Sequence, residues 1–269
     1  MYSIYKNEDL KKLLVISLIG SGFIILTSTF FGKEIGETVT DITYVITTGI
    51  FVTLAFSLVL RFKKTGSHGK SWLFFLGAAV SWCLAETSWT VYELIYKQNP
   101  FPSIADGFYI AGYPLMLGFL VYYLKPVKKA ITKKMLIISI LISLAISIPS
   151  ISMAYSSESN VSVLENVLAT AYPVLDSIIF VPAILGISLF FRGEVNFPWS
   201  LICIGILCFA VGDIGFQFTT FTNTYYTGNP VDMILIWAYI FFSFGSYYHI
   251  RMYRKNESPV QNEDLDRRY

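Results

Sequence analysis

Runs of about 20 mainly apolar residues, separated by short charged loops, repeat along this chain. An α-helix of about 20 residues crosses about 30 Å of hydrocarbon, whereas strands of an outer-membrane barrel are alternating segments of about 10 residues. The runs therefore predict an all-α polytopic membrane protein with eight transmembrane helices. We expect the spans at residues 11–31, 41–61, 71–96, 105–124, 134–154, 165–191, 198–219 and 231–250.

The overall composition agrees with a chain that lies almost wholly in a membrane. Hydrophobic residues make up 54% of it and charged residues 14%, against about 25% charged residues in soluble domains. We therefore expect the lipid bilayer as the main partner and no separate soluble domain. The net charge of +2 is small, so nothing indicates nucleic-acid binding.

Lysine and arginine are concentrated in alternate loops. Loops 61–70 and 125–134 and the segment after the last span are rich in them, whereas loops 32–41 and 155–164 are poor. Cytoplasmic loops of membrane proteins carry an excess of these residues. We therefore expect a multi-pass protein of the cell membrane with both termini in the cytoplasm.

The chain also carries an internal duplication. Residues 11–17 return in nearly the same order as residues 133–139, and the pair Trp72 and Glu86 returns with the same spacing as Trp199 and Asp213. Each half holds four spans, and an even number of spans returns the chain to its starting side. We therefore predict two parallel four-helix repeats related by an axis along the membrane normal. The expected segments are a cytoplasmic N-terminus 1–10, repeats 11–125 and 133–251, a linker 126–132 and a polar tail 252–269.

Acidic residues inside the spans are the main functional candidates, because charged groups within a bilayer are costly. Glu86 and Asp213 lie deep in the third and seventh spans, Asp176 lies about ten residues into the sixth, and Glu93 lies near the outer end of the third. No lysine or arginine lies at that depth. The carboxyl groups therefore cannot all be ionised in a dry site, and some must be protonated, hydrated or neutralised by a bound cation.

Two further acids, Asp106 and Asp232, open the fourth and eighth spans after outer loops. A carboxylate at the start of a helix accepts hydrogen bonds from free backbone N–H groups and suits the positive end of the helix dipole. We therefore expect both residues to cap their helices.

A stripe of alternating indoles and carboxylates marks the third span. Trp82, Glu86, Trp89 and Glu93 have spacings of four, three and four, which places them on one helical face. Such a face could bind a small cation by charge and by cation–π attraction, or it could be an aromatic packing face. The predicted ligand-binding set is Glu86, Trp82, Trp89, Glu93, Asp176 and Asp213.

Several kinds of chemistry lack the residues that they need. The only two histidines, His68 and His249, lie at predicted cytoplasmic ends, so a multi-histidine metal site is not available. No serine or cysteine nucleophile has a base at its depth. We expect no cofactor and lean against an enzyme, although an all-carboxylate metal site stays open.

The sequence following the tryptophan stripe contains a second informative motif. Residues 102–106 read Pro-Ser-Ile-Ala-Asp and are followed by Tyr-Pro-Leu at 113–115. The segment 82–117 resembles the N-terminal multi-pass membrane regions of some bacterial diguanylate cyclases and sensor kinases. The resemblance implies a membrane sensor that passes a signal to a cytoplasmic output domain. The tail 252–269 is too short for such a domain, so we expect a separate signalling partner.

Three functions remain open on these observations. The preferred one is a sensory or ligand-binding module with an outward-facing acidic and aromatic cavity for a small cationic ligand or ion. The alternative is a small cation- or proton-coupled transporter, whose deep acids would be reached by solvent from both sides. The third is a lipid-modifying membrane enzyme.

Overall fold

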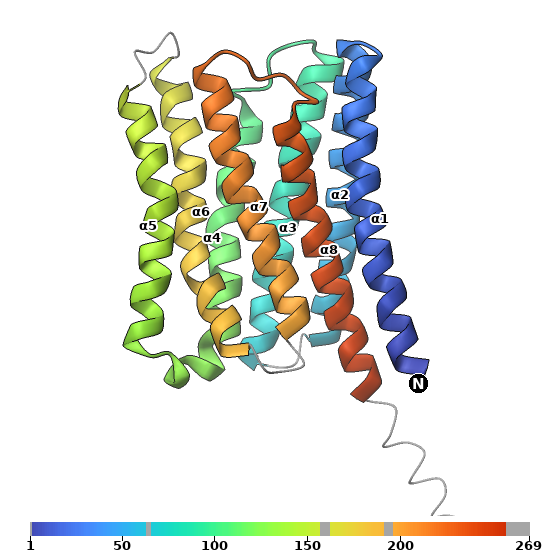
Figure 1. The fold of residues 1–269 in the computed structure, drawn as a ribbon, viewed down its shortest axis with the longest axis vertical. Coiled ribbons are helices and arrows are strands. Elements are labelled where there is room, and N and C mark those ends of the chain that lie inside the picture. The colour runs from blue at the N-terminus through green and yellow to red at the C-terminus, as the bar shows by residue number, and fades with distance from the viewer. Residues whose placement is uncertain (1, 63–65, 157–161, 191–195, 257–269) are drawn as a thin grey trace, which may run out of the picture.

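The chain forms a bundle of eight long α-helices in a computed structural model that describes residues 2–62, 66–156, 162–190 and 196–256 (Figure 1). Those ranges contain no strand. The helices are α1 (Tyr2–Phe30), α2 (Lys33–Phe62), α3 (Gly66–Thr90), α4 (Ile104–Leu124), α5 (Lys133–Ser156), α6 (Val163–Phe190), α7 (Asn196–Phe221) and α8 (Pro230–Asn256). A π-helical turn, Val91–Ile95, extends α3, and a 3-10 helix, Lys125–Ala130, follows α4.

Within the described residues, seven helices are long and apolar enough to cross a membrane, which agrees with the predicted all-α polytopic membrane protein. The exception is α3, which packs against α2 and α4. It buries Trp72, Trp82 and Glu86 in the bundle.

The helix ends depart from the predicted spans at several places. The predicted loop 32–41 is wrong in extent, because α2 begins at Lys33 and only Phe31 and Gly32 separate it from α1. Gly32 has a φ of +117°, which suits glycine in so tight a turn. Likewise α1 begins at Tyr2 and α8 continues to Asn256. Residues 257–269 of the predicted tail lie outside the described part of the chain.

Alternate connections lie at opposite ends of the bundle (Figure 1). The start of α1, the 3-10 helix and the end of α8 lie at one end, which we call the basic end because Arg61, Lys125 and Lys133 also lie there. The connections 96–103 and 222–229 lie at the other, which we call the loop end. All the lysine- and arginine-rich loops predicted to be cytoplasmic thus lie at the basic end.

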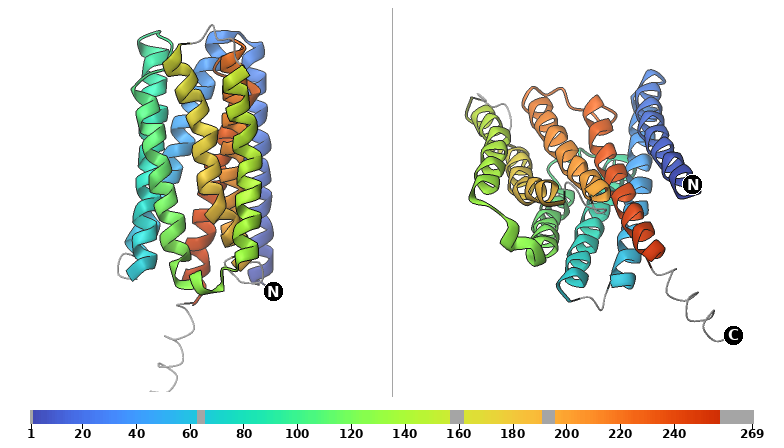
Figure 2. Two further views of the ribbon diagram at one scale, coloured as in Figure 1. Left: turned by 90° about the vertical axis from the view of Figure 1, so that its left-hand side faces the viewer. Right: turned by 60° about the horizontal axis from the view of Figure 1, so that its bottom comes forward.

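The outermost helices of the bundle are α1 and α5, which lie at its two edges (Figures 1 and 2). Both carry large exposed apolar side chains, such as Ile19 and Phe23 on α1 and Leu141 and Ile148 on α5. Apolar surface on this scale is rare on a soluble monomer and is what a lipid bilayer covers.

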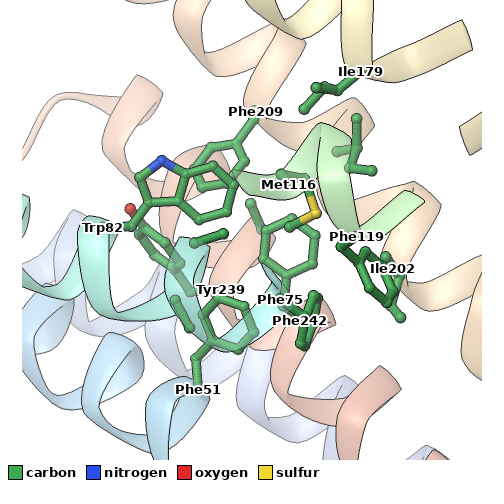
Figure 3. Close-up of a cluster of buried hydrophobic side chains, with 14 of the residues drawn as sticks. Phe51, Phe75, Trp82, Met116, Phe119, Ile179, Ile202, Phe209, Tyr239 and Phe242 are labelled. Carbon is green, nitrogen blue, oxygen red and sulfur yellow. The ribbon is translucent and has the colours of Figure 1, made fainter. Parts of the chain in front are cut away.

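Buried aromatic side chains from several helices pack against one another in the interior of the bundle (Figure 3). The ring of Phe75 lies 5.1 Å from that of Phe51 and 4.5 Å from that of Phe119, between ring centroids, and Phe242 stacks on Phe51 at 5.3 Å. All four side chains are fully buried. We call them the aromatic floor, because they lie on the basic side of the site described next.

Candidate functional site

A small cavity lies in the half of the bundle nearer the loop end, between α3, α4, α7 and α8. Its volume is about 60 Å³, which is room for a few water molecules. Four carboxylate side chains, Glu86, Asp106, Asp213 and Asp232, line it together with tryptophans, tyrosines and phenylalanines. None of its lining residues is lysine, arginine or histidine, so the charge in this cavity is of one sign.

The two deep acids each accept a hydrogen bond from a tyrosine on a helix of the other half of the chain. The Tyr239 hydroxyl on α8 donates to Oε1 of Glu86 on α3 at 2.7 Å, and the Tyr113 hydroxyl on α4 donates to Oδ2 of Asp213 on α7 at 2.6 Å. Glu86 is 4% exposed and Asp213 is 9% exposed. The predicted convergence of these two acids on one site agrees with this geometry.

Asp106 and Asp232, at the starts of α4 and α8, each bind a backbone N–H with one carboxylate oxygen and a tyrosine hydroxyl with the other. Oδ2 of Asp106 accepts from the Ser103 backbone N–H at 2.6 Å, while Oδ1 accepts from the Tyr172 hydroxyl. In the same way Oδ2 of Asp232 accepts from the Gly228 N–H at 2.7 Å. Asp106 caps α4 as expected, whereas Asp232 binds the backbone of the connection just before α8, and both acids also belong to the cavity wall.

The second oxygen of Asp232 has two tyrosine partners. The Tyr225 hydroxyl donates to Oδ1 at 2.9 Å and the Tyr44 hydroxyl at 3.1 Å. Tyr44 comes from α2, so the cavity wall draws on the second helix of the chain as well as on α8. All four lining carboxylates therefore accept a hydrogen bond from at least one tyrosine.

Both predicted tryptophans line the cavity with fixed rings. The Trp82 Nε1–H donates to the Tyr109 carbonyl at 3.2 Å, and Trp89 Nε1–H donates to Oε2 of Glu93 at 3.1 Å. The Trp82 indole occupies the space beside Gly112, where a Cβ atom would lie 2.2 Å from Nε1. Only glycine at that position lets α3 and α4 approach with this ring between them.

Glu93 lies outside the cavity, in a wider polar pocket at the loop end. This pocket, which we call the vestibule, has a volume of about 410 Å³ and includes Lys33, Glu37 and Lys97 in its wall. Oε2 of Glu93 also accepts from the Thr227 hydroxyl at 2.6 Å. Glu93 and Glu86 therefore line different spaces, although they were predicted to form one wall. Trp89 lines both spaces.

Three aromatic rings separate the vestibule from the cavity. The ring centroid of Trp89 lies 6.2 Å from that of Tyr225 and 6.3 Å from that of Phe216, and Phe216 and Tyr225 lie 4.8 Å apart. We call these three residues the aromatic lid. All three line the cavity, and two of them, Trp89 and Tyr225, also line the vestibule.

Asp176, the remaining predicted ligand residue, is not part of the cavity wall. Its side chain is fully buried at 0% exposure, and neither carboxylate oxygen has a hydrogen-bond partner among the described residues. It interacts electrostatically with Asp213. Asp176 therefore lies beside Asp213, which lines the cavity, but is not itself among the lining residues.

The sequence reasoning did not identify the tyrosines or Asp41. Tyr113 follows Asp106 at the same spacing as Tyr239 follows Asp232, and this matching spacing was the available signal. Asp41 is buried on α2, and both of its carboxylate oxygens lack a hydrogen-bond partner among the described residues. The sequence predicts it at the boundary of the span 41–61, because polar residues precede it.

The fold and the site together define a helical membrane bundle with an enclosed acidic and aromatic cavity. The part of the chain that the structure describes has no group of three or more His, Cys, Asp or Glu side chains placed to hold a metal ion. Comparison of the chain with protein-family models, with curated proteins and with solved structures gives no match. The function must therefore be argued from the cavity itself.

Proposed function

We propose that this protein is a membrane sensory or ligand-binding module that receives a small cation in the cavity beneath the aromatic lid. The observation that carries the proposal is the convergence of four carboxylates and two indole rings on one space without a basic side chain. A cation there gains charge attraction from the acids and cation–π attraction from Trp82 and Trp89. The cavity volume limits the unexpanded site to an ion or a group of the size of ammonium or methylammonium.

The tyrosine hydroxyls give a mechanism for a response. Each lining acid accepts a hydrogen bond from a tyrosine, as Glu86 does from Tyr239. A cation bound to Glu86 competes for the same carboxylate oxygens and weakens that bond. Because Tyr239 and Glu86 lie on helices from opposite halves, the loss of the bond lets the halves move relative to one another, which is the type of two-state change a sensor needs.

The arrangement of the walls favours sensing over transport. The aromatic floor closes the bundle on the basic side of the cavity, with Phe75 packed between Phe51 and Phe119. On the other side only the aromatic lid separates the cavity from the vestibule. A site reached from one side alone fits a receptor, whereas a transporter would require the floor to open in another state.

We also propose that the halves 11–125 and 133–251 are parallel repeats. Support comes from hydrogen bonds that occur in reciprocal pairs, each bond having a counterpart with the helices of the two halves exchanged. The bonds are Tyr113 to Asp213 and Tyr239 to Glu86, and Tyr172 to Asp106 and Tyr44 to Asp232. Such reciprocity is expected of an approximate twofold axis along the bundle.

The basic end would face the cytoplasm in this proposal, because lysine and arginine mark cytoplasmic loops. The vestibule and the aromatic lid would then face outward. The end of α8 lies at the basic end (Figure 1), where it could contact a separate signalling partner. Its last described residues, 253–256, continue the helix beyond the apolar span.

Ligand titration with the full chain in lipid nanodiscs tests the proposed function. Ammonium, methylammonium and sodium chloride, each at constant ionic strength, are added while tryptophan emission is recorded. We expect a saturable change for at least one cation and an affinity at least about tenfold lower in Glu86→Gln, a difference of about 1.4 kcal/mol. Glu34→Gln, at an exposed carboxyl group on α2, is the matched control. Equal affinities in the two variants, or no saturable change with any of the cations, would contradict the proposal.

A cation- or proton-coupled transporter is the second candidate. It is favoured by the buried acids Asp176 and Asp41, which have no hydrogen-bond partner among the described residues and could exchange protons. Flux of protons and sodium into proteoliposomes distinguishes it from the sensor. Flux above that of empty liposomes, abolished in the double variant Glu86→Gln with Asp213→Asn, would support transport.

A further inference from the structure

The carboxyl groups of Asp176 and Asp213 lie side by side next to the cavity, with too few hydrogen-bond donors for both. Asp176 on α6 and Asp213 on α7 interact directly. Asp176 is 0% exposed, and neither of its oxygens has a hydrogen-bond partner among the described residues, because the nearby Tyr113 hydroxyl is bonded to Asp213. An ionised carboxylate is only an acceptor of hydrogen bonds, so two ionised groups here would face one another with like charge and no hydrogen between them.

The surrounding helices supply too few donors to hold both groups as anions. Tyr113 on α4 has one hydroxyl hydrogen, and it is donated to Oδ2 of Asp213. From α5, the Ser143 hydroxyl donates to the Ser177 carbonyl instead. The other titratable groups that face Asp213 are Glu86 on α3, Tyr172 on α6 and Tyr239 on α8. None of these groups is a cation.

We propose that Asp176 and Asp213 share a single proton and form a proton-binding site behind the wall of the cavity. The shared proton supplies the missing hydrogen bond and removes one of two adjacent charges, and Tyr113 stabilises the charge that remains. This site takes a proton and not the cation of the proposed function, so either proposal can fail without the other.

The count of protonated carboxyl groups in asparagine variants tests the shared proton. Infrared spectra of the full chain in nanodiscs at neutral pH give the area of the carbonyl band of protonated carboxyl groups. An asparagine amide supplies the hydrogen that the shared proton supplies in the wild type. We therefore expect Asp176→Asn and Asp213→Asn each to lose the area of one carboxyl group. The double variant should lose no more than either single variant, and if one single variant does not fold the other gives the same comparison.

Two results would overturn the shared proton. Wild-type band area in the double variant would mean that the pair holds no proton, and a double variant that loses twice the area of a single one would mean that each group holds its own proton. Asp41→Asn is the matched control, since Asp41 is a buried acid on another helix that also lacks a hydrogen-bond partner among the described residues. When Asp41→Asn is combined with Asp176→Asn, the band area lost should equal the sum of the two separate losses.

Thermal unfolding gives a second measurement. Removal of the shared proton at high pH leaves two like charges side by side, so the unfolding temperature of the wild type should fall as the pH rises above neutral. Asp176→Asn has only one charge in the pair and should fall less. Parallel decreases in the two proteins would contradict the proposal.

Discussion

The Tyr239 hydroxyl on α8 donates a 2.7 Å hydrogen bond to the Glu86 carboxylate on α3, so residues 153 positions apart meet in the cavity wall. Glu86 is nearly buried and its cavity has no basic residue. Tyr239 therefore binds the buried carboxylate of Glu86 and, through the same hydrogen bond, connects the two halves of the chain.

Loss of this hydroxyl should destabilise the folded bundle. Tyr239→Phe keeps the ring and leaves a buried acceptor with one partner fewer, which costs about 1 kcal/mol. Chemical unfolding in detergent micelles measures the change. Tyr247→Phe, at an exposed tyrosine on the same helix, should change the free energy of unfolding much less, and equal effects would show that the bond to Glu86 contributes nothing.

The contact between Gly112 and Trp82 predicts a difference between two glycines of one helix. A Cβ atom at Gly112 would lie 2.2 Å from Nε1 of Trp82, whereas one at Gly107 would meet nothing within 4 Å. Gly112→Ala should therefore cost about 1–3 kcal/mol of stability and shift the emission of Trp82. Gly107→Ala should be neutral or slightly stabilising, because alanine favours the helix. Equal stabilities would mean that Trp82 has free space into which it moves.

Removal of the tryptophan ring of the aromatic lid should expose the cavity. Trp89→Ala opens the wall between the vestibule and the cavity, so a water-soluble carbodiimide should modify Glu86 faster. Peptide mass spectrometry measures the rate of modification. Trp237→Ala removes a tryptophan whose Nε1–H donates to the Leu18 carbonyl of α1, away from the lid, and should leave the rate unchanged. An unchanged rate in Trp89→Ala would place the entrance elsewhere.

A buried amide attaches the edge helix α5 to the rest of the bundle. Gln217 on α7 accepts from the Ser150 hydroxyl at 2.5 Å and donates to the Ser150 carbonyl and to the Thr170 hydroxyl, both at 3.1 Å. Gln217→Ala removes these bonds and should raise the rate of hydrogen exchange in α5 while α3 stays protected. Gln98→Ala, in an exposed connection at the loop end, is the control. The same exchange in both variants would show that apolar packing alone holds α5.

The helices were predictable because crossing hydrocarbon requires a long apolar run. The ends of the helices were not predictable in this way. For example, α2 begins at Lys33 and includes Glu34 and Glu37, which are compatible with a helix but not with a membrane interior. The depth and the shared helical face of Trp82, Glu86 and Trp89 predicted that they would lie together, and all three line the cavity. Neither property fixes how a helix is rotated against helices remote in sequence.

The partners of the acids were hidden for a different reason. Aromatic residues make up 17% of the chain, so a single tyrosine carries little information. Only packing shows that Tyr113 reaches Asp213 rather than another acid. Asp176 illustrates the same limit: its level in the membrane could be read from the sequence, but its position behind Asp213 depends on how α6 and α7 meet.

The divided use of Asp106 and Asp232 has a consequence for the proposed sensor. Each carboxylate binds a backbone N–H just before a helix with one oxygen and a cavity tyrosine with the other. A cation bound in the cavity, as we propose, would compete for both oxygens. The starts of α4 and α8 would then respond to the bound charge by becoming more ordered or by fraying, and both helices run through the bundle to its basic end.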